Sequence, residues 1–506
     1  MTRDPAILIG IDVGTTSTRV VAFDLSGRTL AAATHGYAMA TPRPDWAEQN
    51  PEDWWEATRQ GLRDVAAAID PARVAGLSFS GQMHGSVFLD REDRVIRPAL
   101  LWCDGRTAAE GAEALRIVGR RRFLSTIKNP PLPSFTLPKL LWLRRHEPRH
   151  WRRLACVLLP KDYVRFRLTG RKAMDVADAA GTAMMEVGAA RWAEPLLKRL
   201  AIDPALLPPL LPSTAQAGRL TAEAARATGL REGTPVVAGA GDQPAGAVGV
   251  GVFRQGQCMI SLGTSGVIFA PTRRAVADPT LALATFDHAV PRVSYLMGCM
   301  LSAGGALQWH RNVSCGEEMA AARQGGFEAY DLMLVRASRV EPGAEGLFFL
   351  PYLMGERSPH NDPKARGAFV GLSIRHERPH LTRAVIEGVS FGLRDCLEAV
   401  RARGVGVTEV RATGGGARNP FWMQTLADVL GVRVRCVESP EGSALGAALM
   451  AGVGVGVYNS FNAAAEAAVR LGPMFRPSAG ARRTYEALYA GFRALYPALR
   501  PHFHRA

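Results

Sequence analysis

The feature that most constrains the fold of this chain is a strand–turn–strand pattern that occurs once in each half. In the first copy an apolar strand ends at Asp12, and the turn Gly14-Thr-Thr-Ser leads into a second apolar strand. In the second copy the turn Gly263-Thr-Ser-Gly266 lies between two apolar runs. Because self-similar segments indicate internal duplication, we expect two related domains, each opening with its own polar turn.

Helical and strand patterns alternate along the rest of the chain. Apolar spacing predicts helices over residues 54–68, 137–145, 380–399 and 420–430, and strands over residues 74–80 and 407–412. This alternation is typical of layered α/β domains. A length of 506 residues suits two large domains, which we place at 1–246 and 247–506. An aromatic stripe from Tyr485 to Leu495 predicts a C-terminal amphipathic helix that faces the core.

The composition argues against several classes of protein. The formal net charge is +15, but the basic residues are mostly arginines dispersed along the chain, whereas nucleic-acid-binding surfaces concentrate them. The 7 cysteines lack C-x-x-C spacing, which disfavours a disulfide framework or a zinc site and favours a reducing compartment. The apolar N-terminal stretch is interrupted by Asp12, unlike a signal peptide. We expect a cytoplasmic protein without nucleic-acid or membrane partners.

The two polar turns suggest phosphate binding. An anion-binding concavity is expected from the hydroxyls and amides of Thr15, Thr16 and Ser17. Arg19 adds a positive charge, and Asp12 at the strand end could hold Mg²⁺ through water. Thr264 belongs to the second turn, and two turns facing each other across a cleft would clamp a polyphosphate. Taken alone, the first turn is better explained as a plain polar hairpin, and the second is a weak signal.

A run of three glycines, Gly414 to Gly416, follows the strand over 407–412 and precedes Asn419-Pro420. Glycines permit a flat approach of the backbone to a ring or a phosphate group. We interpret this segment as part of a nucleotide site. The alternative is an ordinary loop in which Asn419 and the following proline start a helix.

Asp242 stands among small residues in Gly239-Ala-Gly-Asp-Gln-Pro, at the end of an apolar run. Small neighbours leave room for a ligand, and a desolvated carboxylate is a better base than one in water. Asp242 and Gln243 are therefore candidates for proton transfer and substrate contact. The alternative, a helix N-cap, explains the aspartate but leaves the lack of bulky neighbours without a reason.

A second candidate for ligand contact is the segment Gly81-Gln-Met83-His84-Gly, which ends the strand over 74–80. An isolated histidine more often has a structural role, but flanking glycines and a strand-end position favour a ligand contact. Trp102 and Asp104 follow closely and could add an aromatic wall and polar groups. For Asp104 the alternative is the capping of a helix start.

Several motifs resemble the FGGY family of carbohydrate kinases. Residues 134–146, including Lys139 and Trp142, and residues 367–387 are similar to two sequence patterns of that family. Met83-His84 resembles the members that act on xylulose, since members acting on glycerol typically carry Arg-Glu at these positions. The resemblance extends from about residue 7 to residue 451.

The resemblance implies two ribonuclease-H-like domains of the actin/hexokinase type with a nucleotide cleft between them. It implies an ATP- and Mg²⁺-dependent kinase that converts D-xylulose to D-xylulose 5-phosphate, or else a kinase of another ketose or polyol such as ribulose or a sugar alcohol. By the same resemblance Asp242 is the general base, Asp12 lies near the phosphates and the metal, and Met83, His84 and Gln243 contact the sugar. The residues implied around the nucleotide are Thr15, Thr16, Thr264, Gly304, Gln308, Trp309, Gly415, Gly416 and Asn419.

The sequence departs from the family at three positions. Gln243 stands where asparagine is usual in the xylulose-specific members, Cys103 where asparagine is common, and Asn419 where serine is frequent. The first two affect the sugar side of the site. An ATP-switched actin- or chaperone-like protein remains the alternative outside the sugar kinases, and we expect a monomer or a homodimer.

Overall fold

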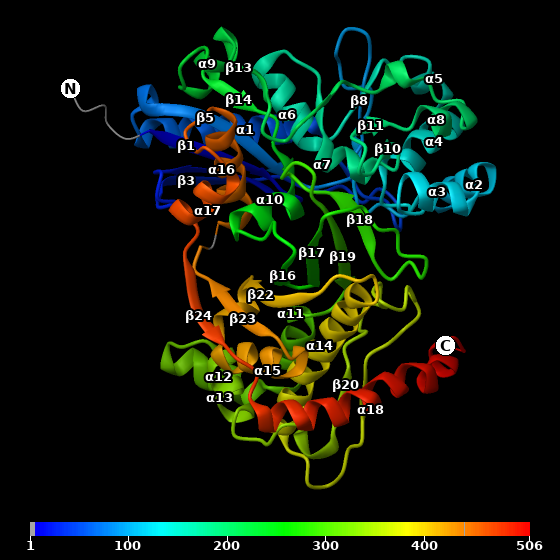
Figure 1. Cartoon of the computed structure of the whole chain (residues 1–506), viewed down its shortest axis with the longest axis vertical. Helices are drawn as coiled ribbons and strands as arrows, with labels where there is room; N and C mark the ends of the chain where they lie inside the picture. Colours follow the sequence, from blue (N-terminus) through cyan, green and yellow to red (C-terminus); the bar gives the residue numbers. More distant parts are fainter. Residues whose placement is uncertain (1–5, 440, 506) are drawn as a thin grey trace.

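The computed structural model describes residues 6–439 and 441–505. Figure 1 shows two lobes stacked along the long axis of the molecule. Within the described residues each lobe is built on a mixed sheet of 7 strands. The first sheet has the spatial order β13 (Gln216–Arg219), β14 (Pro235–Val237), β5 (Val74–Gly81), β1 (Ile7–Val13), β2 (Ser17–Phe23), β3 (Thr29–Gly36), with β15 (Ala240–Gly241) also paired to β5. The second has the order β18 (Ala284–Asp287), β19 (Ser294–Met300), β17 (Gly266–Thr272), β16 (Gly256–Leu262), β22 (Val407–Thr413), β23 (Arg433–Val437), β24 (Leu471–Phe475).

The two sheets repeat one pattern of strand pairing. Strand β1 is antiparallel to β2 and parallel to β5, and β16 is antiparallel to β17 and parallel to β22. Beyond them, β2 pairs antiparallel with β3 as β17 does with β19. The parallel pair β5–β14 corresponds to β22–β23, and each sheet adds an antiparallel strand at that side, β13 and β24. The duplication and the two-domain α/β fold expected from the sequence are thus confirmed.

Helices cover the sheets as the apolar spacing predicts. The predicted helices correspond to α1 (Pro51–Ala68), α4 (Thr136–His146), α14 (Arg378–Arg401) and α15 (Pro420–Leu430). Helix α1 packs on β2 and β3. Helix α14 packs on β17 and β19, and also on α11 (Gly304–Ser314). The aromatic stripe lies on α18 (Ala479–Phe503), which buries Tyr485, Tyr489 and Phe492. The predicted strands are β5 and β22.

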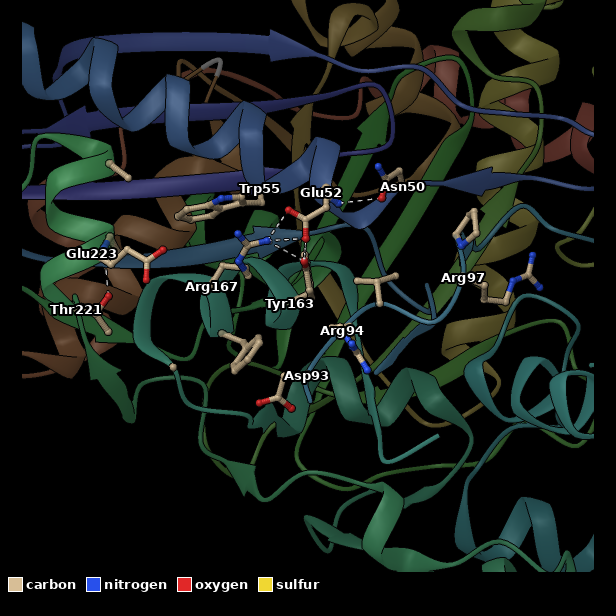
Figure 2. Close-up of a pocket in the computed structure, with 16 residues that line it drawn as sticks. Asn50, Glu52, Trp55, Asp93, Arg94, Arg97, Tyr163, Arg167, Thr221 and Glu223 are labelled. Carbon is tan, nitrogen blue, oxygen red and sulfur yellow. Dashed lines mark hydrogen bonds and ion pairs between the residues drawn. The ribbon is translucent and has the colours of Figure 1, made fainter. Parts of the chain in front are cut away.

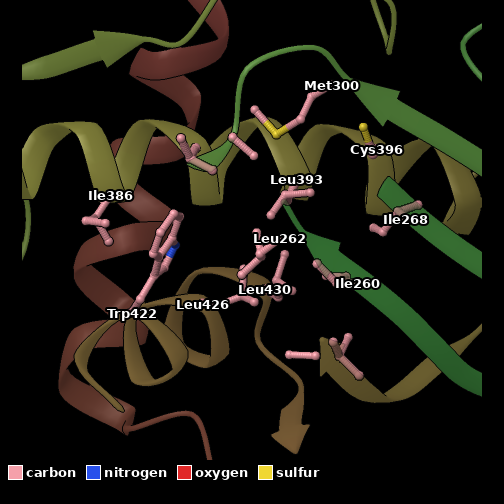
Figure 3. Packing of buried hydrophobic residues seen from close by; sticks show 14 of the residues in the cluster. Ile260, Leu262, Ile268, Met300, Ile386, Leu393, Cys396, Trp422, Leu426 and Leu430 are labelled. Atoms are coloured by element: carbon pink, nitrogen blue, oxygen red, sulfur yellow. The ribbon is translucent and has the colours of Figure 1, made fainter. Parts of the chain in front are cut away.

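Apolar side chains from the strands and the helices of the second lobe hold its polar turn in place. Figure 3 shows Ile260 and Leu262 of β16 and Ile268 of β17 beside Leu393 of α14 and Trp422 of α15. All five are at most 2% exposed. Full burial of one such aliphatic side chain contributes about 1.5–3 kcal/mol. The turn between β16 and β17 is therefore mounted on a rigid core.

Helix α16 (Gly442–Gly454), from the second half of the chain, packs in the first lobe against β1, β5 and α10 (Asp242–Gly249); Figure 1 shows it in orange beside β1 and β5. The two helix backbones touch, because a Cβ atom at Gly446 would lie 1.8 Å from the carbonyl oxygen of Ala245. This close approach accounts for the Gly/Ala-rich stretch that begins at Ser443. Among the described residues no helix is both long and apolar enough to cross a membrane. The boundary expected after residue 246 falls inside α10 and stays a prediction.

Candidate functional site

Two cavities meet at Asp242 and Gln243, the first two residues of α10. The larger cavity has a volume of about 850 Å³ and is lined by both lobes, including Asp12, Gly415 and Ser443. The smaller cavity, of about 540 Å³, is lined by the candidate sugar contacts and by a loop of the second lobe. Because Asp242 and Gln243 line both cavities, their side chains lie close to groups bound in either one.

Asp242 is suited to accept a proton near neutral pH. Desolvation by the surrounding protein, and then the negative charge of Asp12, raise the pKa of Asp242 from 3.8 to about 7. The alternative of an N-cap is wrong, because Gly241 is the capping residue of α10 and makes no side-chain cap bond. Gly241 must also be small, since a Cβ atom there would lie 2.6 Å from Cγ of Met83.

Asp12, the last residue but one of β1, lies at the wall of the larger cavity and opposite Ser80 of β5 in the sheet register. Its Oδ1 atom is buried without a hydrogen-bond partner among the described residues. Burial, and then the charge of Glu441, raise the pKa of Asp12, and the neighbouring Ser80 side chain opposes this rise. An unpartnered buried carboxylate oxygen fits a hydrated cation.

The same region contains no group of three or more His, Cys, Asp or Glu side chains that could hold a metal among the described residues. Mg²⁺ usually binds to one or two carboxylates together with waters and substrate phosphates. Asp12 therefore fits as the protein ligand of a magnesium ion that arrives with a nucleotide.

The first polar turn makes its hydrogen bonds beside the smaller cavity and not beside the larger one. Thr15 donates from Oγ1 to Gln82 (3.3 Å) and accepts on the same oxygen from the indole of Trp102 (3.1 Å). Thr15, Thr16 and Ser17 line neither cavity. Arg19 does line the larger cavity, but its guanidinium is ion-paired with Glu441, which immediately precedes α16. Phosphate contacts by these residues stay predictions.

The glycine-rich segment of the second lobe reaches the larger cavity through Gly414 and Gly415. Asn419 caps α15 by accepting a hydrogen bond from the backbone N–H of Trp422 (3.1 Å). The second polar turn packs on the start of α11, where the N–H of Gly305 donates to the carbonyl of Thr264 (3.0 Å). Besides those of the first turn, six further predicted nucleotide residues line neither cavity: Thr264, Gly304, Gln308, Trp309, Gly416 and Asn419. Their roles stay predictions.

All five predicted sugar contacts line the smaller cavity, namely Met83, His84, Trp102, Asp104 and Gln243. The ring of His84 is fixed by its Nδ1 atom, which lies 2.7 Å from the carbonyl oxygen of Gly181. Since a carbonyl only accepts, Nδ1 carries the proton. Burial, and then the positive charge of Lys139, lower the pKa of His84 to about 3. The imidazole is neutral, and Nε2 can accept a hydrogen bond from a sugar hydroxyl.

The carboxylate of Asp104 is already engaged by the protein. It accepts hydrogen bonds from the backbone N–H of Ala47 (2.7 Å) and pairs with Arg106 at 2.6 Å. Helix capping is wrong as its role, since α2 (Ala108–Val118) has Thr107 at its N-cap. Asp104 therefore shapes the cavity wall.

The second lobe adds residues to the smaller cavity that sequence reasoning missed. Arg357, Ser358 and Asn361 lie on one loop that lines it. Ser358 fixes this loop by donating to the carbonyl of Ala282 (2.6 Å), just before β18, and accepting from the N–H of Cys299 (3.0 Å) on β19. No strand end or glycine pattern marks these residues, so the sequence offered no signal for them.

A third cavity, of about 720 Å³, lies on the first lobe beside α1, α6 (Pro160–Thr169) and α9 (Ala222–Thr228). Figure 2 shows Glu52, Tyr163 and Arg167 directed at one another. Arg167 donates to Glu52 (2.6 Å) and to Tyr163 (3.0 Å), and its guanidinium lies 4.9 Å from the ring of Trp55. Because these groups satisfy each other, the two cavities that share Asp242 are the stronger candidate site.

Comparisons with known proteins agree with this geometry. The family model for the N-terminal domain of the FGGY carbohydrate kinases matches residues 7–249, and the one for the C-terminal domain matches residues 258–455. The chain is 41% identical to the xylulose kinase of Escherichia coli K12, over 88% of this chain and 89% of that one. It is 35% identical to the xylulose kinase of Bacillus subtilis 168, over 97% and 96% of the two chains.

A solved structure extends the agreement to the whole fold. The crystal structure of xylulose kinase from Rhodospirillum rubrum superposes with a TM-score of 0.90 at 33% identity, covering 98% of this chain and 100% of that one. The family predicted from the motifs is therefore confirmed, and this chain belongs to the FGGY family of carbohydrate kinases.

Proposed function

We propose that this kinase transfers the γ-phosphoryl group of ATP to O5 of D-xylulose, with Asp242 as the general base. The observation that carries the proposal is the position of Asp242 where the two cavities meet. The relatives named xylulose kinase at 35–41% identity support the choice of sugar.

The reaction needs a hydroxyl in the smaller cavity that points at a phosphate in the larger one. The carboxylate of Asp242 accepts the hydroxyl proton while the oxygen attacks the γ-phosphorus in line. One O–P bond forms, the bond from the γ-phosphorus to the bridging oxygen breaks, and ADP leaves. A pKa of about 7 leaves a large fraction of Asp242 ionised at neutral pH.

The larger cavity offers groups suited to a nucleotide. The first residues of α16, Gly442 and Ser443, line it, and the N-terminus of a helix favours negative charge. Gly415 on the opposite lobe allows close approach of a flat group. Mg²⁺ beside Asp12 would neutralise charge on the phosphates.

The smaller cavity offers groups suited to a neutral polyol. The neutral imidazole of His84 provides an acceptor, the amide of Gln243 provides both a donor and an acceptor, and Trp102 provides an apolar wall. Polar groups that pair with specific hydroxyls discriminate strongly against analogues that lack them.

The test is an ADP-release assay with a panel of D-xylulose, D-ribulose, D-gluconate and two sugar alcohols. D-gluconate belongs in the panel because the gluconokinase of Bacillus subtilis 168 is 31% identical over 91% of this chain. D-xylulose should give the highest kcat/KM. No rate with D-xylulose would reject the proposed substrate, and a slow ATPase unaffected by every sugar would favour an ATP-switched protein.

A further inference from the structure

Lys139, on α4, joins two separate segments of the wall of the smaller cavity. Its side chain is completely buried. Its Nζ atom donates one hydrogen bond to the carbonyl oxygen of Ser134 (2.6 Å) and another to that of His84 (2.9 Å). Both Ser134 and His84 line the smaller cavity, although they are distant in sequence. The position of one wall segment therefore depends on the other through a single side chain.

The backbone of His84 needs such support. Its φ angle is 67°, in the left-handed region that costs a residue other than glycine roughly 1–2 kcal/mol. The carbonyl of His84 also accepts a hydrogen bond from Oγ1 of Thr136 at 3.3 Å. Together with the bond from Nδ1 to Gly181, these contacts determine where Nε2 points.

Burial lowers the pKa of Lys139 itself to about 7, so its side chain is only partly charged at neutral pH. A neutral amine still has two N–H groups, which suffice for the two carbonyls. Burial is the main cause of the lowered pKa of His84, and the charges of Lys139 and Arg357 act in the same direction. A protonated imidazole would donate from Nε2, whereas the neutral ring accepts there. Through its two hydrogen bonds Lys139 stabilises the orientation that a sugar hydroxyl donor requires.

We propose that Lys139 is a positioning residue for the sugar substrate: it holds the carbonyls of His84 and Ser134 in register so that Nε2 of His84 receives a sugar hydroxyl. This inference rests on the proposed function, because it presumes a sugar in the smaller cavity. It differs from a purely structural role, which would lower stability and the active fraction but would leave the sugar affinity of the folded enzyme unchanged.

The test compares Lys139→Met with Arg144→Met in the full-length enzyme. Arg144 lies on the same helix and also donates to two backbone carbonyls, those of Leu200 (2.7 Å) and Ala201 (3.0 Å), but it does not line the smaller cavity. Lys139→Met should raise the KM for the sugar about ten- to a hundredfold, the range for loss of a charge-assisted hydrogen bond. Its KM for ATP should stay within about twofold of wild type, and Arg144→Met should leave both values within about the same factor.

Sugar binding without ATP, measured by calorimetry, gives a second readout. If Lys139→Met folds and lowers only kcat, with an unchanged sugar KM, the inference is overturned. If it does not fold, Lys139→Gln replaces it; the shorter neutral amide cannot bridge both carbonyls, and a wild-type sugar KM in that variant would equally overturn the inference.

The same comparison separates the two proposals. A wild-type preference for another sugar contradicts the proposed substrate, and Lys139→Met is then measured with the preferred sugar. A wild-type enzyme that binds no sugar at all would overturn both proposals. Loss of sugar affinity in Lys139→Met, with ATP affinity retained, supports the positioning role whichever sugar is used.

Discussion

Replacing Asp242 by asparagine should make the protein more stable at high pH while destroying its activity. The folded-state pKa of Asp242 is about 7, against 3.8 for an unperturbed side chain. The folded state therefore favours the protonated carboxyl, and its ionised form destabilises the fold. This penalty is absent below pH 3.8, grows between the two pKa values and is complete above about pH 7.

The size of the effect follows from the shift. Each pKa unit corresponds to 1.36 kcal/mol, so the full shift would amount to about 4 kcal/mol. Asp242 is partly exposed to the two cavities, and solvent there screens the charge. We therefore expect Asp242→Asn to raise the free energy of unfolding by about 2 kcal/mol at pH 8 and by much less at pH 5.

The assay is urea unfolding at pH 8 and pH 5, combined with ADP release at pH 8. Glu223→Gln is the matched control, because Glu223 is an exposed carboxylate in the cavity of Figure 2, and its replacement should change stability by less than about 0.5 kcal/mol. General-base catalysis contributes about 10²–10⁴-fold, so Asp242→Asn should lose at least that in kcat. Equal stability gains at both pH values, or a rate within tenfold of wild type, would refute the reasoning.

Four other changes test the remaining parts of the site and the fold. The pH profile of kcat/KM should fall on the acidic side with an apparent pKa near 7, as Asp242 becomes protonated. Gly446→Ala should lower the free energy of unfolding in urea by about 3 kcal/mol, because its Cβ would lie 1.8 Å from the carbonyl oxygen of Ala245. Gly181→Ala should raise the sugar KM about tenfold with little effect on ATP, since the new Cβ would lie 2.7 Å from Nδ1 of His84. Chelation of divalent cations should abolish transfer in the ADP-release assay while sugar binding, measured by calorimetry, persists.

Much of the fold could be predicted because its determinants are local. The hairpins follow from apolar runs interrupted by Gly-Thr-Ser turns, and the main helices follow from spacing along their own segments. The duplicated strand order extends this local pattern, and the structure repeats it strand by strand. The position of α16 was not predictable in this way. Its Gly/Ala-rich composition indicates a close helix contact but does not indicate that α10 is the partner.

The same distinction between local and distant determinants applies to the candidate site. Asp242, Met83 and His84 could be found because small residues surround them within a few positions of the chain. The hydrogen-bond and ion-pair partners of the site residues could not be predicted. Lys139 donates a hydrogen bond to His84, and Glu441 forms an ion pair with Arg19. Both contacts join residues that are distant in sequence, so no local pattern predicts them.

The duplication supplied two similar scaffolds, but the two lobes differ in what they contribute. In the first lobe, Asp12 is the last residue but one of β1, and α10 begins at Asp242. At the equivalent place in the second lobe, β16 ends at Leu262 before Gly263 and Thr264, and no acid takes the place of Asp12. From the second lobe the larger cavity is lined by Gly414 and Gly415 among other residues. Both lobes contribute to its lining, and the backbone contact between α10 and α16 fixes Asp242 against the chain that returns from the second lobe.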